Sequence, residues 1–358
     1  MSVISQVDTR SMILFHSGIK AEPTRILYDY ALKKFLEYYR ISNPDELPRI
    51  DQKEIQIMLE DYLIYLRNQN KSRSVIKTFY NSLSLFLSMN DVICNWKKLK
   101  KMFPSAIKPR GNKPYSTEQV KQLLRLFGNS PKYYALVHFI SASGVRDGFS
   151  EELRIRHLTD MPNDCKAVKV YGDDIAEYDT FIHQEAVKAL NEYFEYRKKK
   201  GEKLTPDSWV FANDFDTSKP ITTNDIVAHF SHKVKGKIDR GELINGRYEI
   251  PIIYGLRKRF NTILKSNRKI NPHIIEKMFG HSTTIPLDNN YFKPQLEQLF
   301  EEYQKAIPDL IIDDTFRLEQ ELKLKDEKIA SMEQAKNRIS YLENKVDEII
   351  SHYQNTKN

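Results

Sequence analysis

Residues 139–158 read FISASGVRDGFSEELRIRHL, and they place Arg146 two positions after Gly144 at the end of an apolar helical run. Glycine readily adopts the left-handed backbone conformation that ends many helices, so Gly144 predicts a turn here. Beyond such a turn we expect the Arg146 side chain to point into a cleft instead of continuing the face of the helix. Capping of the helix C-terminus by Arg146 is the alternative interpretation.

Two further segments carry side chains that suit the same kind of site. YGLRKRF at 254–260 places Arg257 in a short helix with apolar flanks, and GHSTTIPLDNNYF at 280–292 places Tyr291 ten residues after His281. Each residue alone has an ordinary explanation: Arg257 could form a surface ion pair, His281 could be buried, and Tyr291 is one of 20 tyrosines. Their order along the chain is what suggests a common site.

Arg146, a predicted hairpin, YGLRKRF, the Gly-His pair and Tyr291 follow one another in an order that resembles the catalytic domain of the tyrosine recombinases, also called the phage integrase family. The chain is most similar to the divergent archaeal branch, in which SGxR before LRxRHL, GxRKxF, and GHST before a tyrosine recur. The resemblance covers about residues 22–307. Its helical N-terminal part, which resembles the core-binding domain of the family, is the less specific part.

The resemblance implies a chemical role for each residue. Arg146 and Arg257 would hold the two non-bridging oxygens of a DNA phosphate by charge-assisted, forked hydrogen bonds that strengthen as negative charge develops. Tyr291 would be the nucleophile and form a 3′-phosphotyrosyl bond. Because an unperturbed phenol has a pKa of about 10, it needs nearby cations or a base. His281 would hydrogen-bond the phosphate, and neither a metal nor another cofactor is expected.

Two neighbouring residues are alternatives for these roles. Arg259 is less favoured than Arg257, because Arg257 holds the position after the leucine that the family uses. Tyr303 is a weaker candidate nucleophile than Tyr291, because the amphipathic spacing of LEQLFEEYQKAI around it predicts packing in a core.

The sequence departs from the family pattern at two positions. Tyr254 stands where most members have histidine, and a phenol cannot readily serve as a general base near pH 7. The family lysine that protonates the leaving 5′ oxygen normally lies in the hairpin turn, where this chain has Asp173 and Asp174. Lys169 on the preceding strand is our candidate, with Lys166 as the next. If no lysine acts, cleavage is slow or absent.

Length and composition are those of a two-domain soluble protein. The chain has 358 residues, with 56 Lys and Arg against 48 Asp and Glu and a net charge of +8. Cys94 and Cys165 are the two cysteines, without CxxC or paired-histidine spacing, which argues against a disulfide framework or a zinc site. No apolar run approaches the roughly 20 residues of a membrane helix, and no signal peptide is recognisable, so we expect a cytoplasmic protein.

We expect a mainly α fold with a small antiparallel β-sheet, divided into five segments. These are a loosely ordered N-terminal segment at 1–21, a helical core-binding domain at 22–102, a basic interdomain linker at 103–115, a recombinase catalytic domain at 116–307 and a coiled-coil tail at 314–353. Prolines and glycine at 104, 109, 111 and 114 exclude a regular element from the linker.

Within the catalytic domain, local patterns predict individual elements. The β-rich stretches KAVKVYG and EYDTFIH, separated by DDIA, predict a hairpin over 166–183. Ser116 with Gln119 forms a capping box that begins a helix, and further helices are predicted over 131–143, over 184–199 and from 223 to about 305.

Basic residues concentrate between the two predicted domains. From 97 to 113 there are seven of them and no acid, a pattern that would neutralise DNA phosphates and release counterions. A solvated linker without a partner is the alternative. The predicted DNA-binding residues are Lys71, Arg73, Lys77, Lys97, Lys98, Lys100, Lys101, Lys108, Arg110 and Lys113.

The tail repeats apolar residues at coiled-coil spacing. Leu318, Leu322, Ile329 and Met332 alternate by four and three residues if Lys325 fills the intervening position. Ala335, Ile339, Leu342, Val346 and Ile349 then resume the alternation in a register shifted as by a stammer. This pattern predicts self-association, and a helix that packs back on its own domain is the alternative.

The resemblance predicts a site-specific DNA recombinase or integrase that acts on double-stranded attachment sites as a homo-oligomer, a tetramer on DNA. A second hypothesis is a DNA-binding architectural protein that has kept the fold and lost the chemistry. A third is a type IB topoisomerase, which uses the same residue set as a monomer.

Overall fold

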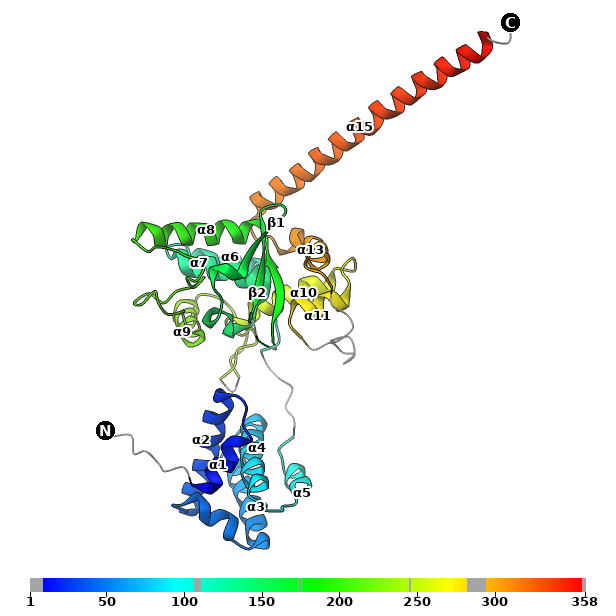
Figure 1. Ribbon diagram of the computed structural model, residues 1–358. Helices are drawn as coiled ribbons and strands as arrows, with labels where there is room; N and C mark the ends of the chain where they lie inside the picture. The colour runs from blue at the N-terminus through cyan, green and yellow to red at the C-terminus, as the bar shows by residue number, and fades with distance from the viewer. Residues whose placement is uncertain are drawn as a thin grey trace. The chain divides into compact units, whose positions relative to one another are not determined.

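The computed structural model describes residues 9–105, 111–172, 174, 176–244, 246–281 and 294–355. It forms two compact units, Met1–Lys108 and Pro109–Asn358, which we describe separately (Figure 1). No helix among the described residues is both long and apolar enough to cross a membrane.

The first unit is helical throughout. Its elements are α1 (Arg10–Ser17), α2 (Glu22–Tyr39), the 3-10 helix η1 (Pro44–Arg49), α3 (Gln52–Asn68), α4 (Arg73–Met89) and α5 (Trp96–Lys101). The expected loose order of the N-terminal segment is wrong for α1, because Phe15 is fully buried with its ring 5.5 Å from that of Phe86. A helix of eight residues is too short for its periodicity to stand out in the sequence.

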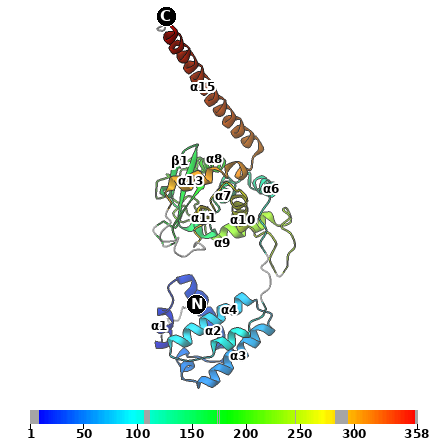
Figure 2. The same ribbon diagram turned by 90° about the vertical axis from the view of Figure 1, so that its right-hand side faces the viewer.

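The second unit surrounds a three-stranded antiparallel sheet with helices (Figures 1 and 2). Its strands are β1 (Leu158–Met161), β2 (Cys165–Val170) and β3 (Tyr178–Ile182), in the order β1-β2-β3. The hairpin prediction is confirmed by β2 and β3, and the four-residue strand β1 was not predicted. Two short 3-10 helices, η2 (Asp147–Glu151) and η3 (Ile155–His157), precede β1.

The helices of the second unit are α6 (Thr117–Phe127), α7 (Pro131–Ser143), α8 (Gln184–Lys199), α9 (Thr223–Val234), α10 (Tyr254–Ser266), α11 (Pro272–Met278), α13 (Leu296–Gln304), α14 (Ile307–Leu310) and α15 (Asp314–Asn355). The predicted bounds of α7 and α8 are confirmed, as is the capping box of Ser116 and Gln119. Of the helices predicted from 223 to about 305, α9, α10, α11 and α13 are present, and the described residues between α9 and α10 form irregular loops.

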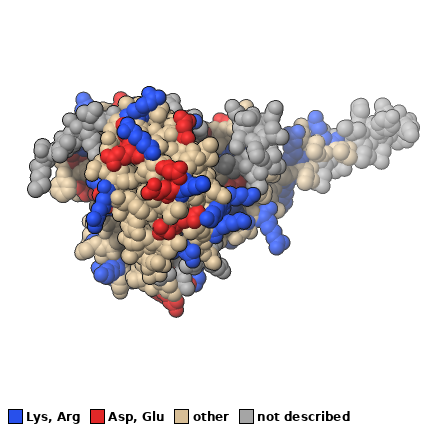
Figure 3. Space-filling model, turned by 90° about the horizontal axis from the view of Figure 1, so that it is seen from below, with Lys and Arg blue, Asp and Glu red and all other residues tan. Residues whose placement is uncertain are grey.

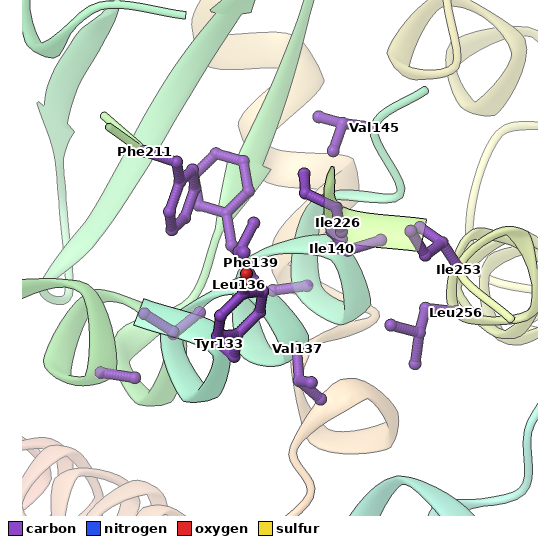
Figure 4. Close-up of a cluster of buried hydrophobic side chains, with 14 of the residues drawn as sticks. Tyr133, Leu136, Val137, Phe139, Ile140, Val145, Phe211, Ile226, Ile253 and Leu256 are labelled. Atoms are coloured by element: carbon purple, nitrogen blue, oxygen red, sulfur yellow. The ribbon is translucent and has the colours of Figure 1, made fainter. Parts of the chain in front are cut away.

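The sheet separates two hydrophobic cores, because side chains alternate between its faces. Val168 and Val170 face the core built by α6, α7 and α8, part of which Figure 4 shows around Leu136 and Phe139. Ala167 and Phe181, which pair in register, face the core built by α10, α11 and α13. Helices from two distant parts of the chain are thereby fixed against one sheet.

The start of α15 is held to the body of the second unit by a buried carboxylate. Glu185 on α8 accepts hydrogen bonds from the main-chain N–H groups of Ile312 at 2.9 Å and Asp313 at 2.8 Å. Asp313 in turn caps α15 by accepting from the N–H of Thr315 at 2.7 Å. The residues at which α15 begins therefore belong to the packed unit.

Candidate active site

The C-terminus of α7 is the point on which the candidate site is built. The last carbonyls of an α-helix lack partners within the helix. Here Ala142 O accepts from the Tyr303 hydroxyl at 2.9 Å, and Ser143 O accepts from the Thr180 hydroxyl at 2.7 Å. Gly144 O accepts from Nη1 of Arg257. Donors from α13, β3 and α10 thus meet at one helix end.

Gly144 turns the chain out of α7. Its φ of +59° lies in the left-handed region, and a Cβ at this position would overlap the ring of Phe260. Both features require glycine. Arg146 follows with an extended backbone, φ −72° and ψ 152°, so its side chain leaves the helix direction as the sequence predicts.

Arg146 and Arg257 lie side by side, although 110 positions separate them in the chain. Nη2 of Arg146 donates to the carbonyl of Gly280, and Nη2 of Arg257 donates to the carbonyl of Phe279 at 3.0 Å. Because these acceptors belong to consecutive residues, the two guanidiniums are neighbours. Arg257 is buried and Arg146 is partly exposed.

Tyr178, the first residue of β3, contacts both arginines. Its hydroxyl accepts from the main-chain N–H of Arg146 at 3.4 Å, and the Arg146 guanidinium lies 5.7 Å from the centre of its ring. Burial raises the pKa of Tyr178, and the positive charge of Arg257, followed by hydrogen bonds from Arg146 and Arg257, partly offsets that rise. The sequence does not single out Tyr178, because a tyrosine in a strand indicates core packing and nothing more.

Gly280 fixes the position of His281. At the end of α11 the N–H of Gly280 donates to Lys277 O at 2.9 Å and the N–H of His281 donates to Glu276 O at 3.1 Å. With Gly280 at φ +59°, this is the Schellman arrangement of a helix end. This arrangement turns the chain back so that His281 lies over the last turn of α11. The glycine before His281 is therefore required by the backbone conformation.

His281 is held by hydrogen bonds at both ring nitrogens. Nδ1 lies 2.8 Å from Oε2 of Glu276, and Nε2 lies 3.2 Å from Nη2 of Arg257. A carboxylate accepts and a guanidinium donates, so these partners assign the proton to Nδ1. Burial tends to raise the pKa of Glu276, but its hydrogen bonds from Lys265 and His281 outweigh burial and lower it. Glu276 thus orients the imidazole toward Arg257.

Tyr254 begins α10, one turn before Arg257, and its side chain is 44% exposed. It lines a cleft of about 710 Å³ together with Arg240 and Tyr248. Nζ of Lys258 lies 5.0 Å from the centre of its ring. Tyr254 therefore lines an open, basic cleft.

The two candidate lysines lie at opposite ends of β2. Nζ of Lys169 is 3.0 Å from Oε1 of Glu177 across the hairpin, and its side chain is 47% exposed. Lys166 pairs with Asp160 on β1. Lys169 is thus the lysine at the turn end of the strand, and an ion pair holds it there.

The two alternative residues, Arg259 and Tyr303, are buried and bonded to other parts of the second unit. Arg259 is buried and donates to Leu310 O at 3.3 Å and to Thr117 Oγ1 at 3.2 Å, and burial lowers its pKa to about 10. Tyr303 is fully buried, which raises its pKa well above 10. Tyr291 lies outside the described residues.

Most of the predicted DNA-binding residues of the first unit are exposed. These are Lys71, Arg73, Lys77, Lys97, Lys98, Lys100 and Lys101, on or beside α4 and α5. Lys98 pairs with Glu60 at 2.6 Å, and in the second unit Lys113 pairs with Glu249 at 2.7 Å. Lys108 and Arg110 lie outside the described residues. On the face of the molecule seen in Figure 3, basic and acidic side chains are interspersed.

No protein-family profile and no curated protein matches the chain by sequence. Solved structures do match it. The Tn1549 transposon integrase in complex with circular intermediate DNA is 16% identical over 82% of this chain and 99% of that chain, with a TM-score of 0.58. The XerH site-specific recombinase bound to difH substrate is 17% identical over 78% and 77%, with a TM-score of 0.51.

A lambda integrase dimer bound to a COC′ core site is 15% identical over 80% of this chain and 95% of that chain, with a TM-score of 0.51. At sequence identities this low, the matches show similarity of fold alone, and the three matched structures share one fold. The helical second unit with its three-stranded antiparallel sheet agrees with that likeness. The chain therefore has the fold of the tyrosine recombinases.

Proposed function

We propose that this protein is a site-specific DNA recombinase of the integrase type, which cleaves and rejoins DNA through a 3′-phosphotyrosyl intermediate. The observation that carries the proposal is the arginine pair: Arg146 and Arg257 donate to the carbonyls of two consecutive residues. Two fixed, neighbouring guanidiniums suit the two non-bridging oxygens of one phosphodiester.

The arginine pair would stabilise the negative charge that develops on the phosphate during the reaction. Attack on the phosphorus adds negative charge to the phosphoryl oxygens, and guanidinium groups already in place stabilise that charge without reorganisation. Each guanidinium has five N–H donors, so it can keep a carbonyl partner and still bind a phosphate oxygen. The same positive charge favours the phenolate form of the attacking tyrosine.

The proposed step transfers one bond at phosphorus. Oη of Tyr291 forms a bond to phosphorus as the bond from phosphorus to the 5′ oxygen breaks, and the phenol proton passes to water. A proton passes to the leaving 5′ oxygen, and Lys169 is our proposed donor. His281, oriented by Glu276 through Nδ1, gains a proton on Nε2 as that nitrogen leaves Arg257, and Nε2–H then donates to a phosphate oxygen. Rejoining reverses these transfers.

The matched structures support DNA as the partner, since they are complexes with circular intermediate DNA, difH substrate and a COC′ core site. We propose that this chain binds double-stranded attachment sites and works as a tetramer on them. The exposed lysines and arginines of α4 and α5 would contact phosphates and set affinity without reading sequence.

A catalytically weakened, DNA-binding architectural protein is the second candidate, and one observation favours it. Lys169 is half exposed and bonded to Glu177, so the proton donor is the weakest part of the proposed machinery. In this case the fold would bind and shape DNA while strand cleavage is slow or lost.

Trapping the covalent intermediate tests the proposal. The full chain is incubated with a nicked duplex of its attachment site, from which the cleaved fragment diffuses away. We expect a covalent protein–DNA adduct that is lost in Tyr291→Phe and kept in Tyr196→Phe, a matched change at a half-exposed tyrosine of α8. DNA that is bound but never trapped supports the architectural candidate. Supercoil relaxation by the monomer without exchange indicates a topoisomerase.

Arg257→Lys probes the arginine pair itself. Lysine keeps the charge but loses the forked donor geometry, so we expect adduct formation to slow by about tenfold or more while DNA binding is retained. An unchanged rate would contradict the assignment of Arg257 to the phosphate.

A further inference from the structure

Helix α15 exposes a stripe of apolar side chains over most of its length. Seven of them are each 50–65% exposed: Leu318, Leu322, Ile329, Met332, Ile339, Leu342 and Val346. A continuous apolar stripe on a helix normally faces a partner. We propose that this stripe pairs with the same stripe of a second copy of the chain, in antiparallel orientation, with the two Met332 side chains at the centre.

The spacing of the stripe is the same in both directions from Met332. Ile329 and Ala335 lie three residues from it, Lys325 and Ile339 seven, Leu322 and Leu342 ten, and Leu318 and Val346 fourteen. An antiparallel pair with a two-fold axis at Met332 brings residues at equal distances from the axis opposite each other. Every core position, with Lys325 and Ala335 counted among them, then faces another core position, including across the shift in register after Met332.

Lys325 favours the antiparallel orientation over the parallel one. In a parallel pair each core residue faces its own copy, so two Lys325 ammonium groups would meet in the core. In the antiparallel pair Lys325 faces Ile339 of the second copy. Its methylene stem can then lie along the isoleucine while the ammonium reaches solvent at the edge.

Side-chain volume and one pair of opposite charges agree with this orientation. Ala335 faces the larger Ile329 of the second copy, whereas a parallel pair would place alanine on alanine and leave the layer thin. Asp326 and Lys336 each directly follow a core position, and both are exposed. In the antiparallel pair Asp326 flanks Lys336 of the second copy, and the two-fold axis repeats this attraction on the other side.

The antiparallel pair sets a distance between the two catalytic units. Leu318 of one copy lies opposite Val346 of the other, so the two Leu318 residues are 28 positions apart along the paired helices. At a rise of about 1.5 Å per residue this is about 42 Å. The tails would therefore join two subunits whose packed units need not touch, as when the subunits occupy separate DNA segments.

Site-directed cross-linking of the full chain tests both the pairing and its direction. In a Cys94→Ser, Cys165→Ala background, three proteins carry a single cysteine from Leu318→Cys, Val346→Cys or Met332→Cys. After oxidation without DNA we expect the Met332→Cys protein to form a disulfide-linked dimer. The other two proteins should cross-link when mixed, and give no disulfide-linked dimer on their own.

The other outcomes overturn the proposal. Cross-linking of Leu318→Cys or Val346→Cys with itself would indicate a parallel pair, and the absence of all three dimers would indicate that the tail pairs elsewhere. Sedimentation gives an independent reading: Leu342→Asp, which would face Leu322 of the second copy, should convert a dimer to a monomer, whereas the nearby Ser340→Asp should not. Because these measurements use no DNA, their outcome does not depend on whether the protein cleaves DNA.

Discussion

Removal of the Tyr303 hydroxyl isolates one of the three contacts that hold the end of α7. Tyr303 is fully buried, and its hydroxyl donates to Ala142 O at 2.9 Å. Tyr303→Phe keeps the ring but removes the donor from a buried carbonyl, which costs about 1–3 kcal/mol. For a unit of this size each kcal/mol lowers Tm by about 2–4 °C, so we expect a fall of about 2–12 °C.

Thermal unfolding and adduct trapping together distinguish this structural role from a catalytic one. The adduct on a nicked duplex should still form, because a buried phenol with a raised pKa cannot reach DNA. Tyr196→Phe, at a half-exposed position, is the control and should change neither reading. Loss of the adduct at unchanged Tm would make Tyr303 the nucleophile. An unchanged Tm with the adduct intact would show that the hydrogen bond does not support α7.

Three further changes test other parts of the second unit. Gly144→Ala should destabilise it by about 2–4 kcal/mol in urea unfolding, because the residue has positive φ and a ring packs against it, whereas Gly128→Ala, in an ordinary helical conformation, should be nearly neutral. Burial lowers the pKa of His138 and of His183 to about 3. Below pH 6.5 the unfolded chain therefore binds more protons, and the free energy of unfolding should fall from about pH 6.5 toward pH 3, by up to about 1.4 kcal/mol per pH unit for each histidine. A urea midpoint that stays constant between pH 7 and pH 5 would contradict this. Lys169→Ala should slow cleavage by about 10²–10⁴-fold, and a substrate with sulfur as the leaving atom, which needs no proton, should restore the rate; failure of that rescue would remove Lys169 from the mechanism.

Local signals in the sequence predict those parts of the site that depend on neighbouring residues. Gly144 and Gly280 both end helices in the left-handed conformation, and each places the next functional side chain. The hairpin and the bounds of α7 and α8 follow from short-range periodicity and turn residues. The fold class could therefore be predicted, because short stretches of sequence are enough to indicate its helices and strands.

Contacts between distant segments could not be predicted in the same way. Nothing near Tyr178 indicates that its hydroxyl will lie beside both arginines, and nothing near Glu276 indicates that it will orient His281. The arrangement of the loops between α9 and α10 likewise depends on what they pack against. Tertiary packing determines these contacts, and it produces no periodic pattern in the sequence.

The three donors at the end of α7 also have a consequence for how the protein is made. Thr180, Arg257 and Tyr303 leave the ribosome in that order, and the last of them follows the proposed nucleophile in the chain. A nascent polypeptide that stops before residue 303 lacks one of the supports beneath Arg146. The end of α7 therefore acquires all three of its donors only after residue 303 has been synthesised.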